Sequence, residues 1–97
     1  MKTQKYTFYI GWNNQTKKRE IIKAIRILNK LNVMGFNVNK DILGFWNKTQ
    51  EKSFIIESIA TEENPFNITK AKEIKTQLER ELKQFVVLTT IQDITII

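Results

Sequence analysis

The sequence contains no cysteine and no histidine among its 97 residues. Without cysteine, neither disulfide bonds nor thiolate metal sites can form. Without histidine, the side chain that most often acts as a general base or a metal ligand is missing. Glycine is also scarce, at three residues, and no glycine-rich phosphate-binding loop is present. We therefore expect no metal, no cofactor, no catalytic residues and no enzymatic activity.

Long apolar runs are missing as well. No segment reaches the length of a transmembrane helix, and the first five residues lead directly into strand-like sequence without the apolar core of a secretory signal. A cytoplasmic protein that makes no membrane contact is the expectation. A chain of 97 residues has room for one hydrophobic core, so residues 1–97 should form a single domain.

Acidic residues are outnumbered by basic ones, ten against sixteen, which gives a formal charge of +6. A surplus of this size in a small domain favours an anionic partner, such as a nucleotide, a nucleic acid or an acidic protein surface. Solubility alone is the alternative. Thirteen of the cations are lysine, and lysine codons are A/T-rich, so a low-GC genome would account for part of the surplus.

The hydrophobic pattern alternates between the periods of strands and helices. Near-alternation of aromatic and β-branched residues predicts strands, the first with Tyr6, Phe8 and Ile10 on one side. Apolar residues at three- and four-residue spacing predict helices, the first capped by Thr16 and ending before Gly35, the second capped by Asn67. The predicted strands are 6–12, 36–46 with an interruption at 39–41, 53–60 and 85–90, and the helices are 16–31 and 68–84.

The resulting order is strand, helix, strand, strand, helix, strand. This order predicts an α+β, ferredoxin-like βαββαβ fold, in which a four-stranded antiparallel sheet carries two helices on one face. Right-handed crossovers make it the simplest way to bury both helices on one sheet. Because the other face of the sheet then lacks a cover, and because Ile94, Ile96 and Ile97 follow the last predicted strand, we expect a homodimer. A tail that folds back on a monomer is the alternative.

The first predicted helix concentrates positive charge in two places. Lys17, Lys18 and Arg19 follow Thr16, at the helix end where the macrodipole disfavours cations, and a bound anion would reverse that penalty. A basic stripe, defined as Arg19, Lys23, Arg26 and Lys30, recurs along the opposite face from the apolar residues. We predict an anion site from these two sets, and we expect residues 17–19 to contribute more than Lys70, Lys72 and Lys75, which lie among acids. A solvated, lysine-rich surface explains the same pattern.

Two aromatic segments resemble motifs of RNA-recognition domains. Residues 8–11, Phe-Tyr-Ile-Gly, resemble the first-strand motif of that family, and residues 52–56 resemble its third-strand motif, with Ser53 in place of a glycine and Ile56 in place of an aromatic. The resemblance implies that Tyr9 and Phe54 stack bases on the open sheet face. Ordinary sheet packing is the other explanation for both aromatics.

A second resemblance covers most of the chain. Residues 9–13 (YIGWN), 35–38 (GFNV), 44–46 (GFW), 51–57 (EKSFIIE) and 84–88 (QFVVL) look like a small, functionally uncharacterised family of ferredoxin-like proteins from bacteria, plasmids and phages. The family usually has leucine where this chain has tryptophan at position 12. The resemblance implies the same fold and a mobile-element origin, supplies no catalytic residues, and marks a possible shared cleft at Trp12, Asn13, Trp46, Glu51 and Ser53.

The leading hypothesis is a small binding protein that captures an anionic partner. A counter-defence inhibitor, which sequesters a nucleotide signal or blocks a host factor, is one form of it, by analogy with other proteins of this size. The alternatives are single-stranded nucleic-acid binding through the open sheet face and a structural or assembly role in which the basic surface is only solvated.

Overall fold

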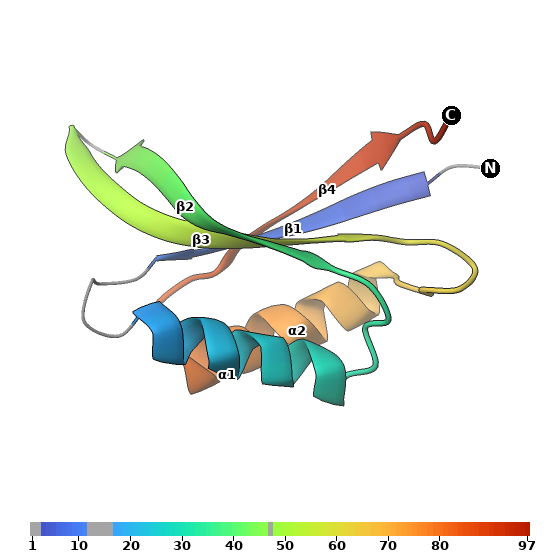
Figure 1. The fold of residues 1–97 in the computed structure, drawn as a ribbon, viewed down its shortest axis with the longest axis horizontal. Coiled ribbons are helices and arrows are strands. Elements are labelled where there is room, and N and C mark those ends of the chain that lie inside the picture. The colour runs from blue at the N-terminus through green and yellow to red at the C-terminus, as the bar shows by residue number, and fades with distance from the viewer. Residues whose placement is uncertain (1–2, 12–16, 47) are drawn as a thin grey trace.

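The computed structural model describes residues 3–11, 17–46 and 48–97, with the backbone alone at 17, 44–46, 49 and 51. Six elements follow one another along the chain (Figure 1): β1 (Thr3–Gly11), α1 (Lys17–Lys30), β2 (Asn37–Trp46), β3 (Thr49–Ile59), α2 (Ile68–Glu81) and β4 (Leu88–Ile94). Within this part of the chain, no helix has the length and apolar content needed to cross a membrane.

The four strands form one sheet in the order β2-β3-β1-β4. Every neighbouring pair is antiparallel, and both helices cover the same face of the sheet (Figure 1). The ferredoxin-like fold that the sequence predicts is therefore confirmed. Figure 1 also shows that no helix covers the opposite face, which we call the open sheet face.

The alternation in β1 places its large side chains in the core. Tyr6, Phe8 and Ile10 are buried because successive residues of a strand point to opposite faces. Phe8 pairs with Ile56 and Ile10 with Phe54 on β3, and these side chains pack against the apolar faces of the helices. The helix residues of this core are Ala24, Ile27 and Leu28 from α1 and Ala71, Ile74 and Leu78 from α2.

The interruption predicted in the second strand is confirmed as an irregularity within β2. The pairing of β2 with β3 shifts register between Asn39 and Ile42. Such a shift leaves extra residues unpaired and increases the local twist. The strand continues to Trp46 beyond it.

The end of α1 differs from the prediction. The helix ends at Lys30, and Asn32, with φ 61°, takes the left-handed conformation while the Val33 N–H donates to the Leu28 carbonyl. Asparagine tolerates this conformation better than most residues. Gly35, predicted as the end signal, instead has its carbonyl accept hydrogen bonds from Ser58 and Asn64.

The side chain of Asn64 links the loop between α1 and β2 to the loop between β3 and α2. Its buried side-chain amide donates to the carbonyls of Gly35 and Ile59 and to the Ser58 hydroxyl, and its Oδ1 accepts from the Met34 N–H at 2.9 Å. One side chain thereby satisfies polar groups from two connections that are about 30 residues apart in sequence. This network holds the loop after α1 against the loop before α2.

The predicted N-cap of α2 is confirmed, but the helix ends earlier than the spacing of its apolar residues predicts. Asn67 accepts from the Lys70 N–H at 2.8 Å, as an N-cap does. The helix ends at Glu81, three residues before the predicted end. The left-handed Lys83, with φ 53°, lets the Gln84 N–H bond back to the Glu79 carbonyl and turns the chain away.

The last strand begins later than predicted. Phe85, the predicted first residue, is fully exposed, whereas Val87 is buried and β4 starts at Leu88. Pairing with β1 fixes this register, from Tyr9 opposite Leu88 to Thr3 opposite Ile94. The strand therefore includes Ile94, which the sequence had assigned to the tail, and the segment beyond it is residues 95–97.

Candidate anion-binding groove between the helices

The start of α1 carries the cations that the sequence places there, but the structure leaves the predicted anion site at this end untested. Thr16 lies outside the described residues, and Lys17 is described by its backbone alone. Lys18 and Arg19 are exposed. The same turn holds Glu20, whose Oε2 is buried and has no hydrogen-bond partner. An acid in this turn opposes a second negative charge beside it, so the helix start alone does not define a site.

The basic stripe lies on the solvent side of α1, as its spacing predicts. Arg19, Lys23, Arg26 and Lys30 are all exposed. Ion pairs join Lys5 to Glu57 and Lys75 to Glu79, and none in the described part of the chain involves a residue of the stripe. Their charges therefore face water without a carboxylate partner in this part of the chain.

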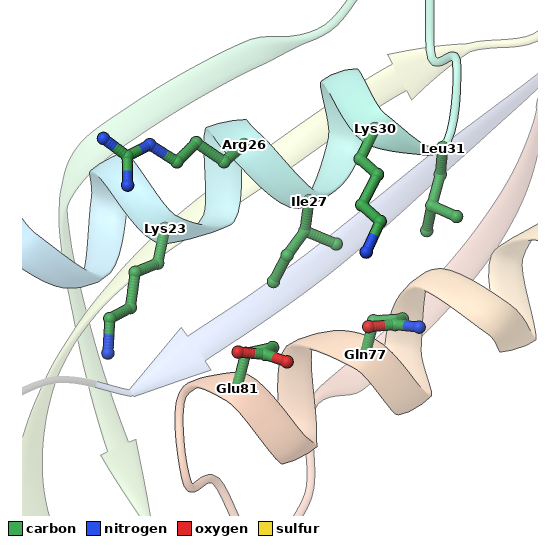
Figure 2. Close-up of a pocket in the computed structure, with 7 residues that line it drawn as sticks. All are labelled: Lys23, Arg26, Ile27, Lys30, Leu31, Gln77 and Glu81. Atoms are coloured by element: carbon green, nitrogen blue, oxygen red, sulfur yellow. The ribbon is translucent and has the colours of Figure 1, made fainter.

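Three members of the stripe border a hollow between the two helices (Figure 2). It has a volume of about 290 Å³. Lys23 and Lys30 extend from α1 toward α2, whereas Arg26 extends along the outer side of α1 (Figure 2). We call this hollow the interhelical groove; its lining residues are Lys23, Arg26, Ile27, Lys30, Leu31, Gln77 and Glu81.

The groove combines an apolar floor with a charged rim. Ile27 is buried and Leu31 is half-buried, and the two lie one helical turn apart between α1 and α2 (Figure 2). Gln77 and Glu81 form the rim on the α2 side. With three cations and one acid, the lining has a net positive charge, and its negative group lies at one edge.

Two cations of α2, Lys70 and Lys75, form contacts that the basic stripe of α1 lacks among the described residues. The Lys70 Nζ donates to the carbonyls of Asn32 and Pro65, at 3.1 and 3.4 Å, and lies 5.7 Å from the centre of the Phe66 ring. It thereby satisfies a carbonyl at the end of α1. Lys75 forms an ion pair with Glu79. Both lysines are bound within the fold.

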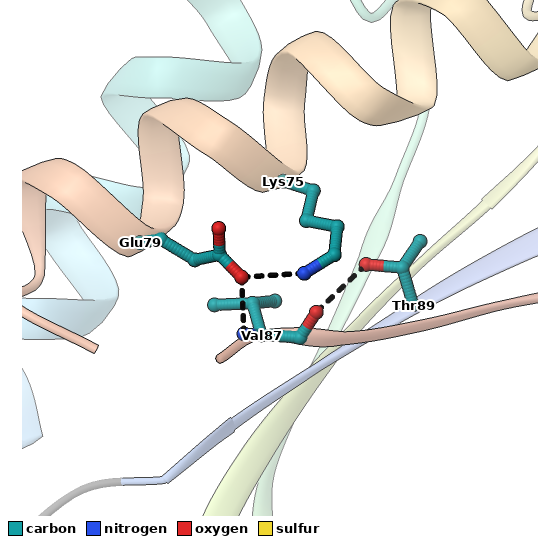
Figure 3. Close-up of polar contacts among 4 residues, drawn as sticks. All are labelled: Lys75, Glu79, Val87 and Thr89. Carbon is teal, nitrogen blue, oxygen red and sulfur yellow. Dashed lines mark hydrogen bonds and ion pairs between the residues drawn. The ribbon is translucent and has the colours of Figure 1, made fainter. Parts of the chain in front are cut away.

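Glu79 links α2 to the start of β4 (Figure 3). Its Oε2 accepts from Lys75 and, at 2.8 Å, from the Val87 N–H. These hydrogen bonds, that from Lys75 foremost, lower the pKa of the carboxyl although partial burial opposes them. On a longer helix Lys83 would lie one turn beyond Glu79 and could pair with it. Lys83 instead lies past the helix end in a left-handed conformation.

The predicted stacking pair on the open sheet face is not formed. Tyr9 is partly exposed on that face, but Phe54 is completely buried on the helix side. The register explains the difference: Tyr9 pairs with Ile55 and Ile10 with Phe54, so the two aromatics point to opposite faces. The prediction that Phe54 stacks a base is therefore wrong, and its aromatic signal came from core packing.

The proposed shared cleft is described only in part. Trp12 and Asn13 lie outside the described residues, and Trp46 and Glu51 are described by backbone alone. The half-exposed Ser53 pairs with Gly11, and Glu51 lies two residues before it on β3. At this end of the sheet the Gln84 side chain donates to the Gly11 carbonyl at 2.9 Å.

The interhelical groove contains residues that the sequence did not single out. Sequence reasoning assigned the stripe to α1 alone and missed the contribution of Gln77 and Glu81 on α2. The signal was available, because two helices on one face of a sheet must lie side by side and their facing edges must meet. Elsewhere in the described chain, no cluster of three acids could hold a metal ion.

Comparison with known proteins identifies the fold. No family model matches the sequence, and no curated protein matches it. Among solved structures, a phage SAM lyase in complex with S-methyl-5'-thioadenosine is 17% identical with a TM-score of 0.64, covering 94% of this chain and 81% of that one. A DUF3240 family protein from Shewanella baltica OS155 is 19% identical with a TM-score of 0.62, covering 97% and 92%.

A third similar structure is CPII, a nitrogen regulatory PII-like protein from Thiomonas intermedia K12, bound to ADP, AMP and bicarbonate. It is 13% identical with a TM-score of 0.61, and the alignment covers 97% of this chain and 91% of that one. At these identities the likeness shows a shared fold, which hosts more than one activity.

Proposed function

We propose that this protein is a non-enzymatic binding protein that captures an anionic partner at the interhelical groove. The observation that carries the proposal is the hollow that Lys23, Arg26 and Lys30 border, with Lys23 and Lys30 extending toward α2 (Figure 2) and with no carboxylate paired to any of the three among the described residues. Fixed positive charges around a concavity raise the local concentration of anions and speed their capture.

The contrast between the helices supports the choice of site. Lys70 and Lys75 are bound to carbonyls, to an aromatic ring and to Glu79. An anion that bound them would have to displace these contacts. Lys23, Arg26 and Lys30 have no such contacts with the described part of the chain, so an anion binds them at lower cost.

The absence of histidine and cysteine from the sequence supports a role without catalysis. Shifted pKa values found among the described groups belong to Tyr6 and Glu79. Burial in the core raises the pKa of Tyr6, whose hydroxyl donates to Gln4, and Glu79 holds the start of β4. Both shifts have structural causes, and neither residue lines the groove.

A thermal-shift screen tests the proposal. The anions are ATP, ADP, AMP and cyclic mononucleotides, a single-stranded oligonucleotide and a polyglutamate peptide, and nucleotides come first because CPII holds ADP and AMP. A ligand at about 100 times its dissociation constant stabilises by about 2.7 kcal/mol, which corresponds to a rise in Tm of roughly 10–20 °C for a domain of this size. At least one anion class should reach this range.

Two charge-reversal variants locate the site. Lys23→Glu combined with Lys30→Glu should abolish the stabilisation, whereas Lys72→Glu, an exposed lysine on α2, should leave most of it. No stabilisation by any anion, or equal losses in both variants, would contradict the proposal. Chemical turnover of a nucleotide, seen as a new product by mass spectrometry, would contradict its non-enzymatic part.

We also propose that the open sheet face joins two copies of the chain. Tyr9 and Leu88 are paired across β1 and β4, and both are exposed, as is Ile59 on β3. Burying these side chains between two copies removes apolar surface from water. Leu88→Ser, or deletion of residues 95–97, should weaken the dimer, whereas Phe85→Ser, at an exposed site before the strand, should not. Sedimentation of an 11.5 kDa species at high micromolar concentration would contradict the dimer.

A further inference from the structure

We infer that the partner of the interhelical groove is an acidic amphipathic helix of another protein. This inference rests on the proposed function, since it assigns a class of ligand to the same site. Nothing in the groove requires a small ligand. Its volume of about 290 Å³ is at the lower limit of small-molecule pockets, which run from about 300 to 1,000 Å³ and bury most of their ligand.

The floor of the groove matches the apolar face of a helix. Ile27 and Leu31 lie one turn apart along α1 and face the space between α1 and α2. α1 and α2 are packed side by side on one face of the sheet (Figure 1). A third helix laid along the space between them would place its own apolar residues, at three- and four-residue spacing, over this floor.

The rim of the groove matches the acidic flank of such a helix. Lys23 and Lys30 are seven residues apart, which is about 10.5 Å along α1, with Arg26 between them. Carboxylates at the same spacing on a partner helix would lie opposite Lys23 and Lys30, the two cations that extend toward α2 (Figure 2). Complementary charge of this kind steers association and fixes the register of the partner.

A nucleic acid fits the groove less well. Phosphates in the groove would meet Glu81 on its far rim, and the apolar floor would contact no base or sugar that needs it. An acidic helix can place its carboxylates on the α1 side alone and polar donors opposite Gln77 and Glu81, which accept hydrogen bonds, while the floor covers its leucines. The lining therefore favours a protein helix over a polynucleotide.

The test uses two synthetic peptides as long as α1, which has 14 residues. The first has leucine at its fourth, eighth and eleventh positions, glutamate along one flank and glutamine along the other; the second has the same composition in an order without helical periodicity. Fluorescence anisotropy measures their affinity for the full chain. The amphipathic peptide should bind about tenfold more tightly than the scrambled one, because burial of a single leucine accounts for a factor of that order.

Two variants distinguish the contribution of the groove's shape from that of its charge. Lys23→Glu with Lys30→Glu should lower the affinity of the amphipathic peptide about tenfold or more, since each reversal turns an attraction into a repulsion. Gln77→Trp retains every charge but fills the hollow, so it should reduce binding of the amphipathic peptide to the level of the scrambled one. The exposed Lys72→Glu should change affinity less than about twofold, and circular dichroism checks the fold of each variant.

The outcomes distinguish the inference from the function on which it rests. Equal binding of both peptides, lost on reversal of Lys23 and Lys30 but unaffected by Gln77→Trp, would overturn the helix as partner and leave anion capture in place. Tighter binding of a DNA duplex than of the amphipathic peptide, with the same dependence on Lys23 and Lys30, would overturn it in favour of nucleic acid. Binding of no anion at all would overturn both.

Discussion

The outer side of α1 and the segment from Thr61 to Leu88 use their polar side chains in opposite ways. In the second region, polar side chains form hydrogen bonds within the segment or to other elements; they are Asn64, Asn67, Lys70, Lys75, Glu79 and Gln84. On α1, the basic stripe forms no ion pair with the described residues. The two helices therefore use their polar groups differently: α2 and its connections hold the fold together, whereas the basic stripe of α1 faces solvent.

The largest effect expected within the second region comes from Asn64. Asn64→Ala removes the side-chain hydrogen bonds to the Met34 N–H, the Ser58 hydroxyl and the carbonyls of Gly35 and Ile59, and each lost bond costs about 0.5–1.5 kcal/mol. We expect a loss of about 2–4 kcal/mol in the free energy of unfolding, measured by urea denaturation. A loss below about 1 kcal/mol would mean that water replaces the amide and that the two connections are not held by it.

Glu79 should show a smaller effect that depends on pH. Glu79→Gln removes the charge that binds Lys75 and the Val87 N–H, and we expect a loss of about 1 kcal/mol at pH 7 for this partly exposed group. Because its pKa is lowered in the folded protein, the carboxylate stabilises the fold above the unfolded value of about 4.3. This contribution disappears as the pH falls through the folded pKa.

Urea denaturation of wild type and Glu79→Gln at a series of pH values checks this sign. The difference between them should be constant near neutrality and shrink in acid. Glu73→Gln, an exposed acid on the same helix, is the matched control and should differ little from wild type at any pH. A gap that widens in acid would contradict the assigned role of Glu79.

Lys83 should give the smallest change, in the stabilising direction. Its φ of 53° is a left-handed conformation that glycine adopts without steric cost. Lys83→Gly should raise the free energy of unfolding by about 0.5–1 kcal/mol, whereas Lys83→Ala, which retains a Cβ, should not. Thermal melts of wild type and the two variants measure this change. Equal Tm values for the glycine and alanine variants would rule out backbone strain as the cause.

The sequence predicted those features whose cause is local. The alternation of Tyr6, Phe8 and Ile10, the irregularity after Asn39 and the cap at Asn67 depend on neighbouring residues, and all are found. From them the order of elements and the fold followed. The exposure of the basic stripe followed in the same way, from helical periodicity alone.

Features set by distant contacts were missed. The start of β4 depends on pairing with β1 and on the bond from Val87 to Glu79, so the apolar Phe85 was mistaken for a strand residue. The network around Asn64 joins residues about 30 positions apart, and its loop sequence shows only a turn. The groove likewise requires two helices to be placed side by side, and the opposite directions of Tyr9 and Phe54 require the register of the sheet.

The most direct test of the contrast between the two regions compares two double alanine variants by urea denaturation, with and without inorganic tripolyphosphate. Lys23→Ala with Lys30→Ala should change the free energy of unfolding by less than about 0.5 kcal/mol and abolish the stabilisation by tripolyphosphate. Lys70→Ala with Lys75→Ala should lose about 1 kcal/mol, because carbonyls and Glu79 lose their partners, and should retain that stabilisation. Equal losses of stability and of tripolyphosphate binding in the two variants would contradict the assignment of anion binding to α1 and of fold stabilisation to α2.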